Sequence, residues 1–192
     1  SGAMVGIRKK MDVLGVIVMA VMTAVGGGII RDLVLGIHPP NTFKNPIYVE
    51  YSVLTAVILF VVFYIKKQML DSKALFYYEK IMILLDAIGL GAFTVIGVET
   101  AYEIGYVHHR FLLLFVGVIT GVGGGMIRDM MAQQIPFILV KQIYACASLA
   151  GAGVCIWLMP YHKSASMILG AVVVVIIRIL AATYRWDLPK IE

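Results

Sequence analysis

The stretch Gly26-Gly27-Gly28-Ile29-Ile30-Arg31-Asp32 recurs as Gly123-Gly124-Gly125-Met126-Ile127-Arg128-Asp129, and both copies interrupt long apolar segments. Three consecutive glycines lower helix propensity by about 1 kcal/mol each relative to alanine, and charged residues are costly at membrane depth. The copies lie 97 residues apart, counted from Gly26 to Gly123. The same offset relates Thr23 to Thr120, Pro39 to Pro136 and Lys44 to Lys141, which indicates an internal duplication.

The composition is that of a membrane protein. Hydrophobic residues make up 61% of the chain, charged residues 14%, and the mean hydropathy is +0.94, whereas soluble domains are roughly half apolar and a quarter charged. A span needs about 20 apolar residues, and six such segments are predicted, at residues 13–35, 48–65, 81–101, 111–131, 142–159 and 166–183. Little is left for an extramembrane region, so residues 1–192 are predicted to form a single transmembrane domain.

Several classes of function are excluded by the polar residues. The net charge of +5 comes from basic residues in short loops between apolar runs, which argues against nucleic-acid binding. Cys146 and Cys155 lie in one apolar segment without a metal-ligand spacing, and the carboxylates and histidines are scattered. The chain is therefore predicted to be a non-enzyme without a cofactor or a structural metal.

The duplication predicts the topology. In the second copy the span at 81–101 precedes the glycine-bearing span, so a counterpart is expected before residue 13. Ser1-Gly2-Ala3-Met4 resembles the end of such a helix, which would be truncated in this chain; a remnant of an expression tag is the other interpretation. Three spans per repeat is an odd number, so the second repeat must be inverted. We expect an all-α protein with repeat 1 at about 1–66, repeat 2 at about 80–160 and a seventh helix at about 166–184.

The loop charges predict the orientation, because cytoplasmic loops carry an excess of Lys and Arg. Alternate loops place ten basic residues on one side and three on the other, so the C-terminus is predicted to be cytoplasmic. The larger group is Arg8, Lys9, Lys10, Lys66, Lys67, Lys73, Lys80, Lys141, Arg185 and Lys190, and the smaller is Lys44, Arg110 and Lys163.

The glycine triplets suggest a solute path, because unwound backbone at membrane depth is tolerated where it lines a wettable cavity. Carbonyl groups of residues 22–25 and 119–122 would lose their helical donors, and together with the hydroxyls of Thr23 and Thr120 could face a transient K⁺ or Na⁺ ion. The rival interpretation is that the glycines let helices pack closely. We predict kinked helices that line a pore.

The charged residues of the spans are candidates for gating or ion pairing. Arg31 and Arg128 should lie near opposite mouths of the path. Adjacent helical residues point about 100° apart, so neither arginine should pair well with the neighbouring Asp32 or Asp129, and each should reach another helix or snorkel. A structural ion pair at the interface is the alternative role. Asp86, within an apolar span, should attract cations or pair with an arginine; Arg178 also needs a partner.

At these residues the chain resembles the prokaryotic trimeric intracellular cation (TRIC) channels, which are also grouped with inner-membrane proteins labelled as glycine transporters. The doubled Gly-Gly-Gly-x-Ile-Arg-Asp motif, the Leu85-Asp86-Ala87-Ile88-Gly89 segment, and Arg178 with the closing Trp186-x-Leu188-Pro189 carry the resemblance. It implies a homotrimer in the inner membrane of a bacterium or archaeon, with a K⁺ and Na⁺ pore in each protomer surrounded by lipid. A secondary transporter of glycine or another small amino acid is the alternative, and an assembly protein without transport is the third.

Overall fold

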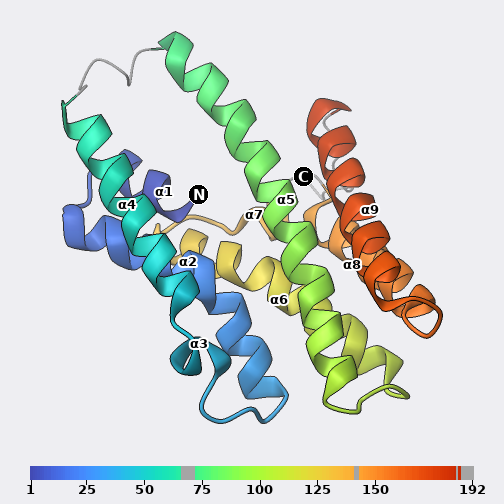
Figure 1. Cartoon of the computed structure of the whole chain (residues 1–192). Helices are drawn as coiled ribbons and strands as arrows, with labels where there is room; N and C mark the ends of the chain where they lie inside the picture. The colour runs from blue at the N-terminus through green and yellow to red at the C-terminus, as the bar shows by residue number, and fades with distance from the viewer. Residues whose placement is uncertain (66–71, 141–142, 185, 187–192) are drawn as a thin grey trace.

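The computed structural model describes residues 1–65, 72–140, 143–184 and 186 (Figure 1). Most of these residues are helical, and none of them forms a strand. Five helices, α2, α4, α5, α6 and α9, contain apolar stretches long enough to cross a membrane, so the chain is an integral membrane protein. The helices are α1 (Gly2–Arg8), α2 (Val13–Val34), α3 (Asn41–Lys44), α4 (Ile47–Ile65), α5 (Ser72–Glu103), α6 (Arg110–Met131), α7 (Phe137–Val140), α8 (Tyr144–Leu158) and α9 (Lys163–Tyr184).

The predicted spans agree with these helices, with two differences in length. The helix α5 begins at Ser72, well before the predicted start at residue 81. The helix α8 has 15 residues, or about 22 Å, which is shorter than the roughly 30 Å hydrocarbon core. It begins after Ile143, whose φ is 39°, and ends at Leu158, two residues before Pro160. Several of the residues used to predict the orientation lie outside the described part of the chain: Lys66, Lys67, Lys141, Arg185 and Lys190.

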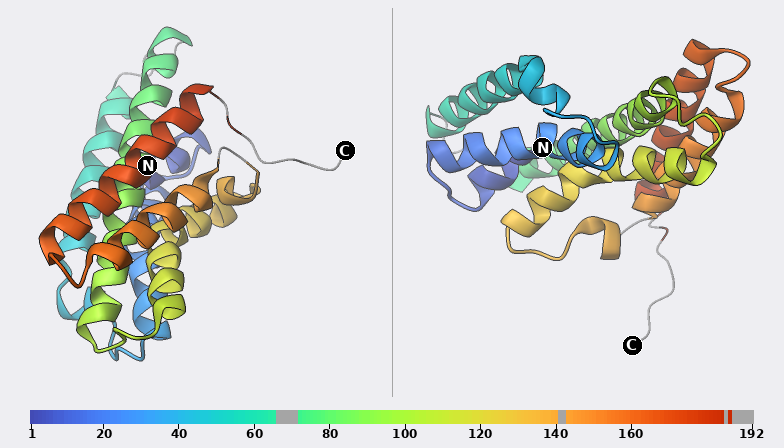
Figure 2. Two further views of the ribbon diagram at one scale, coloured as in Figure 1. Left: turned by 90° about the vertical axis from the view of Figure 1, so that its right-hand side faces the viewer. Right: turned by 90° about the horizontal axis from the view of Figure 1, so that it is seen from below.

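The helices α5, α6, α8 and α9 pack around one apolar cluster that includes Leu90, Val122, Ala147 and Val174. The helix α2 packs against α6, and α4 packs against α2 (Figure 2). Most apolar side chains of α4 are exposed, and Ala56 is its buried residue. Exposed apolar residues are stable where lipid or another protein surrounds them, in keeping with a membrane location.

The glycine triplets lie inside continuous helices, which corrects the expectation of interrupted ones. Both α2 and α6 are α-helical through residues 26–28 and 123–125. The helix axis still changes direction: the ribbon of α2 bends about half way along in Figure 1, and that of α6 bends in the right-hand view of Figure 2. A helix can bend without losing a turn of hydrogen bonds, because small changes spread over several residues.

The ends of α2 and α6 repeat the same turn. Ile37 N donates to Asp32 O at 2.8 Å, and Gln134 N donates to Asp129 O at 3.0 Å. The residue before each donor has a positive φ, 73° at Gly36 and 53° at Gln133. This geometry satisfies helix-terminal carbonyl groups, and glycine adopts it with the least strain. The two turns are therefore equivalent by structure, although the second lacks the glycine.

The helix α1 corresponds to the C-terminal end of α5. Met11 N donates to Gly6 O at 3.0 Å, as Tyr106 N does to Ala101 O at 3.2 Å. The start of α1 matches as well: a methyl group on Gly2 would meet Thr23 and the Met19 carbonyl, and one on Gly97 would meet the equivalent Thr120 and Val116 carbonyl. These correspondences support the predicted duplication; its inverted orientation stays a prediction.

Candidate functional site

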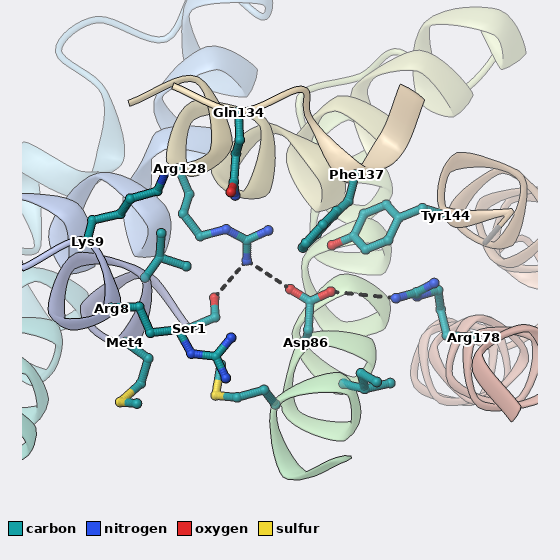
Figure 3. Close-up of a pocket in the computed structure, with 13 residues that line it drawn as sticks. Ser1, Met4, Arg8, Lys9, Asp86, Arg128, Gln134, Phe137, Tyr144 and Arg178 are labelled. Atoms are coloured by element: carbon teal, nitrogen blue, oxygen red, sulfur yellow. Dashed lines mark hydrogen bonds and ion pairs between the residues drawn. The ribbon is translucent and has the colours of Figure 1, made fainter. Parts of the chain in front are cut away.

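Asp86 of α5 lies between two arginines from different helices. Its carboxylate is 3.4 Å from Arg128 Nη1 of α6 and 3.9 Å from Arg178 Nη2 of α9 (Figure 3). Both guanidinium groups are buried, and Asp86 keeps 19% of its side chain exposed. The sequence suggested that Asp86 attracts cations or pairs with an arginine, and the structure shows the pairing. It also provides the partner for Arg178 that the sequence could not identify.

Aromatic rings flank the two arginines. The Arg178 guanidinium lies 4.5 Å from the centre of the Tyr144 ring, and that of Arg128 lies 5.7 Å from the centre of the Phe137 ring. A guanidinium within about 6 Å of a ring face gains cation–π attraction, which is stronger away from water. Neither Tyr144 nor Phe137 was singled out by the sequence, because nothing in their local pattern distinguishes them from ordinary apolar residues.

Each arginine of the repeated motif pairs with the aspartate that follows it. Arg31 Nε donates to Asp32 Oδ1, and Arg128 Nε donates to Asp129 Oδ1, both at 2.8 Å. The expectation that adjacent residues do not pair was wrong: a long arginine side chain curls back far enough to offset the 100° difference in direction. Arg128 also reaches another helix, as expected, through Asp86 and through Ser1 Oγ at 3.1 Å.

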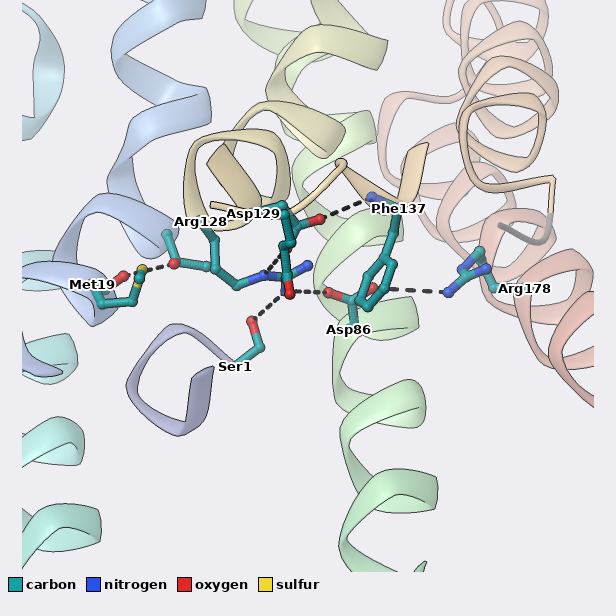
Figure 4. A network of polar contacts seen from close by, with 9 residues as sticks. Ser1, Met19, Asp86, Arg128, Asp129, Phe137 and Arg178 are labelled. Atoms are coloured by element: carbon teal, nitrogen blue, oxygen red, sulfur yellow. Dashed lines mark hydrogen bonds and ion pairs between the residues drawn. The ribbon is translucent and has the colours of Figure 1, made fainter. Parts of the chain in front are cut away.

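The two aspartates anchor the segments that follow their helices. Asp32 Oδ2 accepts a hydrogen bond from Asn41 N at 2.7 Å. Asp129 Oδ2 accepts one from Phe137 N at 2.9 Å (Figure 4). Gln134 Nε2 adds a third donor to Asp129, at 3.1 Å. Buried carboxylates need such partners, so the Asp residues tie α3 to α2 and α7 to α6.

The hydroxyls of Thr23 and Thr120 are used inside their own helices. Thr23 Oγ1 donates to Met19 O, and Thr120 Oγ1 donates to Val116 O, both at 2.6 Å. Because the helices continue through both triplets, the backbone carbonyl groups of residues 22–25 and 119–122 are not set free as the sequence suggested. The hydroxyl oxygens keep lone pairs, so an ion could still use them as acceptors.

Two cavities share Asp86 as a lining residue. We call the first, of about 370 Å³, the basic cavity; Arg8, Lys9, Arg128 and Arg178 are among its lining residues. The second, of about 550 Å³, is the hydroxyl-rich cavity, lined by Thr23, Thr120, Gly28, Gly125 and Arg31 and by hydroxyl and amide side chains of residues 41–55. Ser1, Asp86 and Tyr144 line both. Of the other predicted site residues, Arg128 lines the basic cavity, whereas Gly26, Gly123, Asp32 and Asp129 line neither cavity.

The other glycines of the two triplets lie at the contact between α2 and α6, and some of them also line a cavity. Gly27 and Gly124 line the hydroxyl-rich cavity and also lie at the contact between α2 and α6. Gly26 and Gly123 lie at this contact but do not line the cavity. Farther along α5, Glu99 and Glu103 form ion pairs with Lys163 of α9, and the Glu99 pair has a distance of 2.8 Å. Within the described residues, no three His, Cys, Asp or Glu side chains are grouped closely enough to hold a metal ion.

Residues 1–64 and 83–160 match the profile of a family described as glycine transporter. The UPF0126 inner membrane protein YadS of Escherichia coli is 36% identical over 198 residues, which cover 98% of this chain and 88% of YadS. The UPF0126 membrane protein YvgT of Bacillus subtilis is 32% identical, over 99% of this chain and 89% of YvgT.

Solved channel structures share the fold. A TRIC cation channel superposes with a TM-score of 0.86 at 34% identity, and covers all of this chain and 90% of its own. The TRIC trimeric intracellular cation channel orthologue from Rhodobacter sphaeroides has a TM-score of 0.83 at 31% identity, over 95% of this chain and 90% of its own. These relatives are membrane proteins and channels, not enzymes.

Proposed function

Because this chain belongs to the family described as glycine transporter, and TRIC cation channels share its fold, we propose that it is a passive channel for K⁺ and Na⁺. The conduction path lies within each protomer and joins the hydroxyl-rich cavity to the basic cavity at Asp86. The observation that carries the proposal is that both cavities share this carboxylate as a lining group.

The hydroxyl-rich cavity suits an alkali cation. Thr23, Thr120, Tyr48, Ser52 and Thr55 are among its lining residues. Their oxygens are neutral acceptors that can replace part of the water around a K⁺ or Na⁺ ion without holding it permanently. Gly28 and Gly125 keep part of the wall free of side chains, which is how the glycine triplets would contribute to a pore.

The junction between the cavities is the proposed gate. Asp86 attracts a cation, but Arg128 and Arg178 neutralise it while they stay within 3.4 and 3.9 Å. Both distances exceed the 2.7–2.9 Å of a strong charge-assisted hydrogen bond. A small outward shift of either arginine would therefore expose the carboxylate to a passing ion. Arg31, which pairs with Asp32, lines the hydroxyl-rich cavity, and Arg128, which pairs with Asp129, lies at the junction. The two pairs hold these parts of the path in place.

The assembly and orientation follow the same proposal. We propose one transmembrane domain, two inverted repeats, a homotrimer with lipid around it, and a cytoplasmic C-terminus. The trimer rests on the description of the Rhodobacter sphaeroides channel as trimeric, and the orientation rests on the distribution of basic residues between loops.

Recording from purified protein in a planar bilayer tests the function. We expect unitary currents that follow Ohm's law, with a reversal potential that shifts with the K⁺ gradient. The matched variant Asp86→Asn should change the unitary conductance or the open fraction, and Asp86→Glu should restore part of it. A protein that inserts as a well-behaved oligomer and passes no current would contradict the proposal.

Transport of glycine is the second candidate, favoured by one observation. Asp86, Arg128 and Arg178 bring a carboxylate and two guanidinium groups into one cavity, and a zwitterion needs both charges. No single span carries enough polar groups for such a site, but the structure brings these three together from α5, α6 and α9. Saturable uptake of labelled glycine into proteoliposomes, without unitary currents, would select this function over the channel.

A further inference from the structure

The helix α8 is shorter than α9, against which it packs. It has 15 residues, or about 22 Å, whereas α9 has 22 residues, or about 33 Å. The hydrocarbon core of a bilayer is about 30 Å thick. We propose that the bilayer is thinned beside α8, so that water and lipid headgroups reach down to the first turn of this helix. The inference concerns the surrounding lipid and does not depend on what the protein transports.

Aromatic residues place one end of α8 at the membrane surface. Trp157 and Tyr161 are 71% and 78% exposed, and Trp and Tyr side chains gather where hydrocarbon meets headgroups. Shortly after Tyr161, Lys163 at the start of α9 pairs with two glutamates of α5. Such a charged cluster belongs among headgroups or in water, because charges are costly in hydrocarbon. The shortfall in length therefore lies at the other end of α8, at Tyr144.

The helix α9 shows how far from the membrane surface Tyr144 lies. The Tyr144 ring is 4.5 Å from the Arg178 guanidinium, so α8 begins near the level of Arg178. From there α9 continues for six residues, to Tyr184, or about 9 Å. The helix α8 does not extend to the same level, because Ile143 has a φ of 39° and interrupts it. Lipid beside α8 therefore meets a shorter apolar wall than lipid beside α9.

The first turn of α8 also needs acceptors for its backbone. The first N–H groups of a helix have no partner within it, and unsatisfied donors are strongly unfavourable in hydrocarbon. Ile143 occupies the N-cap position and has no side-chain oxygen to accept from them. Water that enters with a thinner bilayer supplies these acceptors. A bilayer of ordinary thickness would instead bring hydrocarbon against this turn.

Cys146 lies in the first turn of α8, is half-buried and allows a direct test. A charged methanethiosulfonate reagent modifies a thiol where water reaches it, because the thiolate is the reactive form. Ile176 provides the matched control, since it is 50% exposed and is as far along α9 from Arg178 as Cys146 is along α8 from Tyr144. The two proteins are Cys155→Ala, which keeps Cys146, and Ile176→Cys with both native cysteines replaced by alanine.

Both proteins are reconstituted in phosphatidylcholine vesicles. In dioleoyl lipid, Cys146 should react about tenfold faster than the thiol of the Ile176→Cys protein. The Cys146 rate should rise in the thinner dimyristoleoyl bilayer and fall in the thicker dierucoyl bilayer. A rate equal to that of the control would overturn the inference. A rate that is the same in every lipid would also overturn it, because water would then arrive through the protein and not through a thinned bilayer.

Trp157 gives a second measurement, which requires no change in α8. In Trp186→Phe, Trp157 is the one remaining tryptophan. Its fluorescence should be quenched more by phosphatidylcholine brominated near the headgroup than by phosphatidylcholine brominated near the chain ends. Stronger quenching from the chain ends would place Trp157 near the bilayer centre. The shortfall would then not lie at Tyr144, and the inference would be wrong.

Discussion

Gly27 of α2 and Gly124 of α6 meet at the crossing of their helices in a reciprocal arrangement. A methyl group on Gly27 would overlap the Thr120 carbonyl oxygen, and one on Gly124 would overlap the Thr23 carbonyl oxygen. Thr23 and Thr120 are themselves equivalent in the two copies of the motif. The two halves of the duplicated chain thus contact each other through the same residues, as close packing of membrane helices requires.

Replacement of either central glycine by alanine should weaken this crossing. Gly27→Ala and Gly124→Ala force a methyl group into backbone atoms, so each should lower the free energy of unfolding by about 1–3 kcal/mol. Thermal unfolding in detergent, followed by loss of the monodisperse peak, measures the effect. Gly124→Leu should be more severe and prevent folding.

The neighbouring glycines give the matched control. A methyl group on Gly28 or Gly125 would come no closer than 3.9 and 3.6 Å to its surroundings. Gly28→Ala and Gly125→Ala should therefore leave stability unchanged, or raise it by up to about 1 kcal/mol through helix propensity. Equal losses at all four positions would show that backbone freedom, and not close packing, explains the triplets.

Neutralisation of Asp86 should leave two buried guanidinium groups without the carboxylate between them. Asp86→Asn is expected to destabilise the protein by about 2 kcal/mol or more, because breaking a buried ion pair strands its partner charge. The measurement is the unfolding midpoint of Asp86→Asn beside that of Asp86→Glu, which keeps the charge. If the two variants have the same unfolding midpoint, the charge of Asp86 does not contribute to stability.

Asp129 should be more important than Asp32 for the segment that follows its helix. Asp129 accepts from Arg128, Gln134 and Phe137, whereas Asp32 accepts from Arg31 and Asn41. Each hydrogen bond to a charged group contributes about 1.5–3 kcal/mol, so Asp129→Ala should destabilise more than Asp32→Ala. Limited proteolysis should show faster cleavage within residues 132–136 in Asp129→Ala. Faster cleavage in Asp32→Ala at that segment would refute the assignment.

The buried hydroxyls of Thr94 and Ser148 join α5 to α8 at 2.7 Å. Thr94→Val and Ser148→Ala should each be destabilising because the remaining hydroxyl loses its partner, and the double variant should cost less than their sum. A double-mutant cycle in thermal unfolding should give a coupling of about 0.6–1.7 kcal/mol, the range found between membrane helices. Strict additivity would mean that the pair does not stabilise the bundle.

The sequence predicted the helices well, because a membrane makes local composition decisive. Backbone groups must find partners within their own segment in lipid, so long apolar runs become helices almost wherever they occur. The spans at 13–35 and 111–131 became α2 and α6 within a residue or two. Sequence reasoning predicted kinked helices, and α2 and α6 do bend (Figure 1, Figure 2). It was wrong that the triplets break the helices, because both stay α-helical through residues 26–28 and 123–125.

The sequence predicted some residues of the functional site but not how they pair. Asp86 and Arg128 could be singled out because a charge inside an apolar segment is expensive. Their pairing with each other, the role of Tyr144 and the partner of Arg178 could not, since these residues lie on four helices and come together only when the bundle is packed.

The amino-acid sequence by itself determined the class of the protein, the positions of its spans and its duplication, because these depend on composition and on order along one chain. The tertiary structure decided which arginine pairs with which carboxylate. It also decided which glycines line a cavity and which lie where two helices touch. Such choices depend on distances between segments far apart in the sequence, and those distances are set by the packing of all the helices together.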